Sequence, residues 1–548
     1  MGEEVVTPEE GFARSTAVMA VGTTISRITG FLRISAMAFA LGVAQTRLAD
    51  SYNVANNTPN IVYELVLGGV LTSVFVPVFV EWLQRHGRDD AWEVARATMT
   101  ITVIVLIAIM AITIVLAPWI VRLYTTRVPH TPAGNAERAL ATFFLRWFMP
   151  QIVFYGLGAV ATGLLNAHRR FAAPMFAPIL NNLIVIATLF TFAAMAGPTH
   201  PTPDGLTTAQ RYVLALGTTL GVIGMTAALW PSLRRLGFRF RWRLDWRHDA
   251  IRRVGKLALW TFVYVLANQL GLLVVIILAS GGVGGQPPGY TAYTAAFIFF
   301  QLPHAIFAVS IMTALLPALS GHWSDGDVSS FRGLLARGIR ATAFIVIPAA
   351  LGYVVLARPI VGLLLQHGAA TAADATLVAD LLVLFSLGLF SFSAFQLMLR
   401  AFYAMQDTRT PALINIAAVA LNTVVNLIYF FVLDLGVQGL ALGHATAYTF
   451  AAITSGVVLR RRLGGLEGRV ILPGLARVVV AAGATAGVAF LVSEGLSHAV
   501  STTTAGGQAV QVFCSVVAGL VVFVAAAYAL RMEDVSVLRG FLRAQRRG

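Results

Sequence analysis

Two arginines stand six residues apart inside an apolar run near the start of the chain. The stretch "ISRITGFLR" carries Arg27 and Arg33 within residues 14–43, which are long and apolar enough to span a bilayer. An arginine at the centre of a spanning helix costs about 2.5–3.5 kcal/mol, so the pair needs a water-filled cavity or an anion beside it. Two alternatives need no cavity. Arg33 could snorkel to the membrane interface. Arg27 could form a structural ion pair with Asp50 or Glu64.

The next segment, "LADSYNVANNTPNIVYELVLGGV", is too polar to face lipid. Its polar residues cover one broad face of a helix, and that face must line protein or water. A planar guanidinium with five donors suits phosphate oxygens better than a neutral ligand. The two segments together predict a transporter whose first half holds an anionic, phosphate-bearing group. The predicted binding residues are Arg27, Arg33, Asp50, Asn53, Asn57, Asn60 and Glu64.

The second half of the chain is less charged. Its secondary cavity candidates are Asn268, Gln301 and His304. Asn422 and Asn426 lie one helical turn apart and could coordinate a cation together with backbone carbonyls. Hydrogen bonding between helices is the commoner use of such residues, so both interpretations stay open.

Composition identifies the class of protein. The chain has 548 residues, 57% of them hydrophobic and 11% charged, with a mean hydropathy of +0.78. Soluble domains carry roughly 25% charged residues, so this is an all-α polytopic membrane protein. The net charge of +15 resides in short loops and reports topology, not nucleic-acid binding. Cys514 is the only cysteine, which excludes a disulfide framework and a cysteine metal site. We expect no catalytic site, because Asp89 and Asp90 fit a solvated loop.

Glycine, proline and charged residues divide the chain into about fourteen spanning helices. Arginine gathers in the even-numbered loops, so both termini are predicted to be cytoplasmic. Arg122, Arg127 and Arg138 are the main exceptions. The predicted spans are 14–43, 50–83, 95–121, 138–166, 173–197, 210–233, 254–281, 290–320, 340–366, 375–403, 411–433, 438–459, 472–494 and 507–530.

An internal repeat organises these spans. The stretch "NAHRRFAAPMFAPILNN" from Asn166 resembles "YAMQDTRTPALINIAAVALN" from Tyr403 at a shift of 237 residues. Parallel repeats are a transporter design with the substrate site between the lobes. We therefore predict two six-helix lobes plus two C-terminal helices. The predicted segments are a cytoplasmic N-terminus (1–13), an N-lobe (14–233), a basic linker (234–253), a C-lobe (254–459), a basic loop (460–471), two last spans (472–530) and a cytoplasmic C-terminus (531–548).

Several motifs together resemble the MurJ/MviN family of lipid II flippases, of the actinobacterial type, within the superfamily that includes multidrug and polysaccharide exporters. They are "SRITGFLR", "TPN" at 58–60, "GGVLTSVFVPVF", "LLNAHRRFAAPMFAPILNN", "TALLPALS" and "RAFYAMQDTRTP". The resemblance implies a flippase that moves undecaprenyl-pyrophosphate-linked peptidoglycan precursor from the inner to the outer leaflet of the bacterial cytoplasmic membrane by alternating access. It places Arg27, Arg33 and Asp50 at the central cavity and makes the last two helices a groove for the lipid tail.

The chain departs from the family pattern in two places. Many relatives carry arginine after the Pro-Asn of the second span, where this chain has Tyr63 and Glu64, and another in the eighth span, where "AAFIFFQLPH" has none. The alternatives are a flippase for another polyprenyl-linked oligosaccharide and a multidrug exporter. The resemblance implies no cofactor, coupling to the membrane potential or to a Na⁺ or H⁺ gradient, and a monomer. Its partners would be the polyprenyl-pyrophosphate-linked glycan lipid, membrane lipids and a cytoplasmic regulator.

Overall fold

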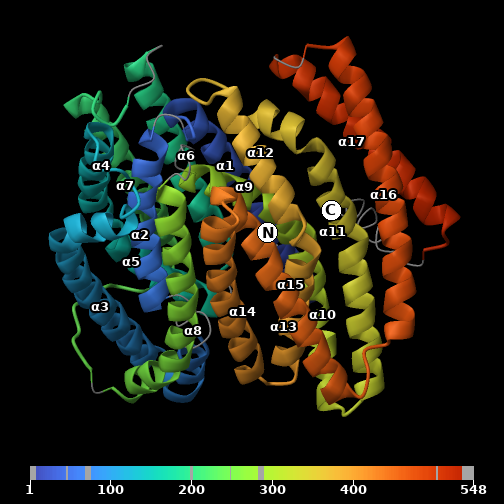
Figure 1. Ribbon diagram of the computed structural model, residues 1–548. Coiled ribbons are helices and arrows are strands. Elements are labelled where there is room, and N and C mark those ends of the chain that lie inside the picture. Colours follow the sequence, from blue (N-terminus) through green and yellow to red (C-terminus); the bar gives the residue numbers. More distant parts are fainter. Residues whose placement is uncertain are drawn as a thin grey trace, which may run out of the picture. The chain divides into compact units, whose positions relative to one another are not determined.

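The computed structural model describes residues 8–44, 47–67, 76–168, 170–197, 202–246, 248–281, 289–501 and 504–532. The outermost parts of the predicted terminal segments, 1–7 and 533–548, lie outside these ranges, as do Arg169 and Arg247 of the basic loops. All regular elements in the described ranges are helices, which confirms the predicted fold class. The chain forms two compact units, Met1–Gly281 and Gly282–Gly548 (Figure 1).

Unit 1 contains eight helices among its described residues. They are α1 (Pro8–Leu41), α2 (Leu48–Leu67), α3 (Val76–Tyr124), α4 (Pro132–Phe148), α5 (Gln151–Ala167), α6 (Ala172–Ala196), α7 (Thr208–Arg235) and α8 (Asp249–Ser280). Helix α3 runs through the predicted loop at 84–94. It breaks at Gly87, whose φ of 86° suits a residue without a Cβ.

Unit 2 contains nine α-helices and two π-helical turns among its described residues. They are α9 (Tyr290–Pro303), η2 (His304–Ala308), α10 (Val309–Ser324), α11 (Val328–Leu365), α12 (Ala372–Ser386), α13 (Leu389–Ala404), α14 (Arg409–Leu427), η3 (Ile428–Val432), α15 (Gly436–Leu463), α16 (Gly468–Ala499) and α17 (Ala505–Ala529).

Twelve described helices are long and apolar enough to cross a membrane, or thirteen when the bent pair α12–α13 counts as one span. The predicted number of fourteen is therefore not confirmed. The difference arises at the second predicted span. Helix α2 carries Asp50 and four asparagines in 20 residues, too polar a composition for a lipid-facing span.

Helix packing in unit 1 places α6 against both α1 and α7, and α5 against α3 and α7. The crossing of α6 and α7 is close. A Cβ added at Gly217 would lie 2.2 Å from the Thr188 Oγ1 atom, so only glycine fits there. On the other side of the unit, the Tyr52 ring packs edge-on against Phe144 and Phe148 of α4. These ring contacts hold α2 against α4.

Helix α8 packs on α2 and α3 and belongs to unit 1. The repeat in the sequence instead assigns residues 254–281 to the second lobe, so the compact units divide one helix later than the predicted lobes. Within unit 2, α11 packs against α12, α13 and α16, and α16 and α17 lie side by side (Figure 1). A buried cluster that includes Phe344, Val478 and Phe523 joins α11, α16 and α17.

Candidate functional site

A polar pocket lies inside unit 1, among α1, α2, α5, α6 and α7. Its cavity volume is about 30 Å³, and its mouth is open. Amides, hydroxyls and one guanidinium make up most of its lining, and no carboxylate contributes. The lining residues are Arg33, Met37, Tyr52, Asn53, Asn56, Gln151, Tyr155, Asn181, Val185, Leu189, Thr218 and Val222.

Arg33 is the cation of this pocket. Its side chain is half-buried and makes no hydrogen bond or ion pair with any residue that the structure describes. One to two turns before Arg33, α1 is hydrogen-bonded to α6. The Asn182 Nδ2 atom donates to Thr29 Oγ1 at 3.0 Å and to the Ser26 carbonyl at 3.3 Å. The five N–H donors of the guanidinium therefore lie beside the pocket without an acceptor among the described residues.

Arg27 does not line the pocket. Its side chain is exposed, and it forms no ion pair with Asp50 or Glu64 in the described part of the chain. The separation follows from helix geometry, since six residues rotate a side chain by about 240° around the axis. The two arginines therefore leave α1 on different faces. A role for Arg27 in binding stays a prediction.

The polar residues of α2 lie in different environments. Asn53 lines the pocket, together with Asn56. Asp50 is fully buried at the start of the helix and lies outside the lining. The remaining predicted residues of α2 are also outside it: Asn57 and Asn60 are half-buried, and Glu64 is exposed.

Five polar residues of the pocket were not predicted from the sequence: Tyr52, Gln151, Tyr155, Asn181 and Thr218. The Tyr52 hydroxyl lies 2.7 Å from Thr218 Oγ1, and Gln151 is fully buried. A search for charged residues misses uncharged groups such as these. The asparagine pair that ends the motif "APILNN" was the one available signal, since α6 is otherwise apolar.

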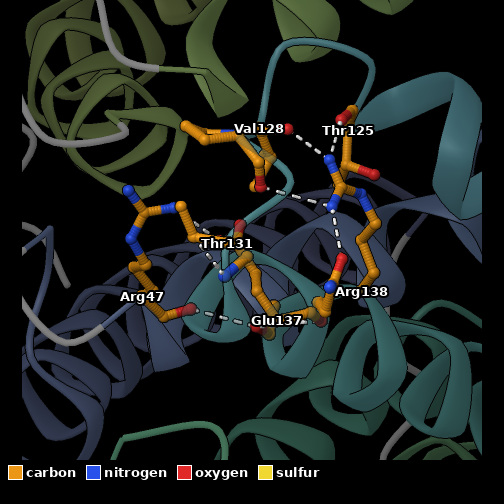
Figure 2. Close-up of polar contacts among 10 residues, drawn as sticks. Arg47, Thr125, Val128, Thr131, Glu137 and Arg138 are labelled. Carbon is orange, nitrogen blue, oxygen red and sulfur yellow. Dashed lines mark hydrogen bonds and ion pairs between the residues drawn. The ribbon is translucent and has the colours of Figure 1, made fainter.

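A second polar cluster lies where α4 begins (Figure 2). Arg47 Nη1 contacts the Glu137 carboxylate at 2.9 Å, and Glu137 is only 2% exposed. Arg138 turns toward the preceding loop and donates to the carbonyls of Thr125, at 3.3 Å, and Val128. Arg138, an exception to the charge rule for orientation, thus binds carbonyls of its own loop.

The candidates from the second half of the sequence do not gather in the unit 1 pocket. Asn268 lies on α8 and donates to the Tyr264 carbonyl at 2.9 Å. Gln301 and His304 lie in unit 2 at the junction of α9 and η2, where the His304 Nδ1 atom is 3.0 Å from Ser393 Oγ.

The predicted cation site contains a hydrogen bond between its own side chains. Asn426 Nδ2 donates to Asn422 Oδ1 at 3.1 Å, so the Asn422 oxygen already has a donor. No group of three or more His, Cys, Asp or Glu residues suited to a metal occurs in the described residues. A cation site at this pair stays a prediction.

Comparisons with known proteins decide the family. The family model "Lipid II flippase MurJ" matches residues 37–505. The chain belongs to the MurJ family of lipid II flippases. A probable MurJ of Rhizobium meliloti is 28% identical over 524 residues, covering 94% of each chain. The MurJ of Burkholderia cenocepacia is 29% identical over 445 residues, covering 80% of this chain and 82% of the relative.

Solved structures show the same fold. A lipid II flippase MurJ in an inward closed conformation matches with a TM-score of 0.74 at 20% identity, covering 94% of this chain and 99% of that one. An inward-facing multidrug transporter of the MATE family, from the MOP superfamily, matches with a TM-score of 0.67 at 14% identity. The predicted family and the multi-pass inner-membrane location are confirmed, and MurJ proteins are transporters, not enzymes.

Proposed function

We propose that this chain carries lipid II, the undecaprenyl-pyrophosphate-linked peptidoglycan precursor, from the inner to the outer leaflet by alternating access. Membership of the MurJ family supports the substrate. The observation that carries the proposal is the Arg33 guanidinium, which is held beside a polar pocket with no protein acceptor in the described residues. An arginine in that position requires an anion or water, and a diphosphate supplies the anion.

The chemistry of the substrate fits this arrangement. A guanidinium binds two phosphate oxygens through parallel N–H donors, and the interaction strengthens where water is scarce. The polyprenyl tail needs only an apolar surface. The helices α16 and α17 present large exposed apolar side chains, among them Phe490, Leu491, Phe513 and Leu520, which support the proposed tail groove.

We also propose that the membrane potential drives the transport step. The proposed step carries the anionic headgroup outward, from the inner to the outer leaflet. The potential contributes about 2.3 kcal/mol per elementary charge per 100 mV, and an anion that leaves a negative interior moves downhill. Coupling to a Na⁺ or H⁺ gradient is therefore not required by the energetics.

The test is depletion of the protein followed by a leaflet-resolved measurement of lipid-linked precursor in the same cells. We expect the precursor to accumulate on the cytoplasmic side, and Arg33→Gln to act like depletion. Thr191→Val serves as the comparison, because Thr191 lies on α6 outside the pocket with its hydroxyl on the Ala187 carbonyl. An unchanged supply of precursor in the outer leaflet after depletion would reject the assignment.

A further inference from the structure

The loop between α7 and α8 exposes large apolar side chains among its arginines. Its stretch "FRFRWRLDW", which begins at Phe238, alternates apolar and charged residues. Phe238 is buried and Phe240 is half-buried. The next three apolar side chains are uncovered, with 67% of Trp242, 59% of Leu244 and 50% of Trp246 exposed. The rule that places arginine in loops accounts for the charges but not for two exposed tryptophans, so this surface indicates an apolar neighbour.

Contacts with α3 hold the loop in place. Arg96 of α3 donates through its Nε atom to the Arg239 carbonyl at 3.1 Å. One turn further along α3, the Thr100 hydroxyl oxygen accepts from the Arg243 backbone N–H at 3.1 Å. The Arg243 guanidinium also lies 3.0 Å from the Glu93 carboxylate. The exposed side chains are therefore carried on a backbone that is attached to the helix at two points one turn apart.

The second attachment point lies at the beginning of the membrane-spanning part of α3. The helix carries no charged residue over 97–121, so its apolar part starts directly after Arg96. Ile104 and Ile107 lie on the same face as Thr100, within about 60° of the helix circumference. Ile104 is 39% exposed and Ile107 43%, and such side chains on a spanning helix face lipid. The loop therefore lies at the end of a lipid-facing stripe of α3, at the level where acyl chains give way to headgroups.

Arg239 and Arg241 add positive charge beside the exposed apolar side chains. Both side chains are exposed, and neither forms a hydrogen bond or ion pair with any residue that the structure describes. Arg243, by contrast, pairs with Glu93 and Asp245. The distribution of arginine predicts that this loop faces the cytoplasm, and the anionic lipids of that leaflet attract basic segments next to a membrane helix. Tryptophan favours the same headgroup level, because its ring is apolar and its N–H is polar.

We propose that the interfacial loop, residues 238–246, lies in the headgroup layer of the cytoplasmic leaflet and binds anionic phospholipid. Arg239 and Arg241 contact the lipid phosphate, and Trp242 and Leu244 enter the region between the headgroups and the acyl chains. A lipid fits this surface better than an acidic protein does, because the surface continues directly into the lipid-facing stripe of α3. The inference goes beyond the proposed function and does not depend on it, since the loop lies outside the polar pocket.

The experiment measures how deep the interfacial loop lies in vesicles that contain the full-length protein. A nitroxide is attached at Leu244→Cys in a Cys514→Ala background, which leaves both tryptophans and every arginine of the loop in place. Oxygen dissolved in the bilayer and a nickel chelate dissolved in water each enhance the relaxation of the nitroxide, and the ratio of the two effects reports its depth. One set of vesicles is made of phosphatidylcholine, and the other also contains phosphatidylglycerol.

The test variant is Arg239→Gln with Arg241→Gln. The matched control is Arg460→Gln with Arg461→Gln, which removes the same charge from two exposed arginines at the end of α15. A free nitroxide in the buffer gives the reading for water. Thermal unfolding checks that each labelled protein is folded, which we expect because all the substituted loop and helix-end residues are exposed.

We expect the label to lie at the headgroup level and to move deeper when phosphatidylglycerol is present. The test variant should lose that shift, and the control should keep it. If nickel reaches the label as freely as it reaches a nitroxide in buffer, the loop lies in water and fits a soluble partner instead. If the depth is the same with and without phosphatidylglycerol, or the test variant keeps the shift, the loop does not recognise anionic lipid. Each of these results would overturn the proposal and leave the transport assignment untouched.

A second measurement needs no engineered cysteine and decides the question if the label disturbs the loop. Short-chain phosphatidylglycerol is titrated calorimetrically into the detergent-solubilised wild type, the test variant and the control. We expect the test variant to bind this lipid at least roughly fivefold more weakly, because two arginine contacts are lost, and the control to bind it as the wild type does. Equal affinity of the test variant and the wild type would contradict the proposal.

Discussion

At pH 9, where Glu137 is ionised, replacing Arg47 by alanine should destabilise unit 1 by about 3 kcal/mol, because the buried carboxylate would lose its partner. The Glu137 side chain is 2% exposed and lies 2.9 Å from the Arg47 guanidinium, which is 29% exposed. Removing one member of a buried pair typically costs about 3–5 kcal/mol. Partial exposure of Arg47 places this case at the lower end. The substitution does not change the backbone strain at this position, because residue 47 has a φ of 55° and alanine carries a Cβ as arginine does.

The double variant Arg47→Ala with Glu137→Gln separates charge from packing. It removes the unpaired charge and leaves a neutral amide, so we expect it to recover about 2 kcal/mol relative to Arg47→Ala. The assay is the free energy of unfolding from chemical denaturation in detergent at pH 9. If Arg47→Ala costs less than about 1 kcal/mol, or the double variant is no more stable than the single one, the buried charge of Glu137 does not depend on Arg47.

Three further perturbations test other parts of the structure. Arg138→Ala should lower the free energy of unfolding by about 2 kcal/mol and speed proteolysis of the loop at 125–131, because it removes donors to the Thr125 and Val128 carbonyls. The control Arg146→Ala should change little, because Arg146 is exposed. Gly217→Ala should lower the free energy of unfolding by about 1–3 kcal/mol, as measured by denaturation, because the new Cβ would lie 2.2 Å from the Thr188 Oγ1 atom. The control Gly352→Ala should be tolerated, because no atom lies near its Cβ position. Burial raises the pKa of Asp407, but hydrogen bonds from Thr410 and the Arg462 guanidinium outweigh it and lower the pKa to about 2. Since the folded pKa lies below the unfolded value of about 3.9, Asp407 stabilises the fold above that pH and loses its contribution as the pH falls toward 2. The free energy of unfolding, measured as a function of pH, should therefore fall as the pH drops from about 3.9 to about 2. In the Asp407→Asn variant this part of the pH dependence should be absent.

The fold was largely predictable from the sequence, because long apolar runs interrupted by glycine, proline and arginine define membrane helices. The helix count was the weak point. Helix α2 is not apolar enough to be recognised as a membrane span, because of the same asparagines that made it a candidate for the binding site. The extended α3 and its break at Gly87 also escaped, since a charged stretch such as residues 85–90 predicts a loop as readily as a solvated helix.

The candidate site was predictable only in part. Arg33 and Asn53 stood out, because charged and amide groups are rare in apolar segments and both line the pocket. The divergence of Arg27 could have been anticipated from the helical rotation alone. The asparagine pair of "APILNN" marked α6, but the position of Gln151 and Asn181 in the pocket could not be predicted, because it depends on which faces of α5 and α6 line it. That packing is set by contacts between helices far apart in the sequence.

The central claim is that the Arg33 guanidinium holds the anionic headgroup during transport. The most direct measurement reconstitutes the purified chain in vesicles that contain fluorescent lipid II, imposes a membrane potential, and follows transfer between leaflets by accessibility to an impermeant quencher. We expect potential-dependent transfer for the wild type, strong loss for Arg33→Gln and partial recovery for Arg33→Lys. Transfer by Arg33→Gln at the wild-type rate would contradict it.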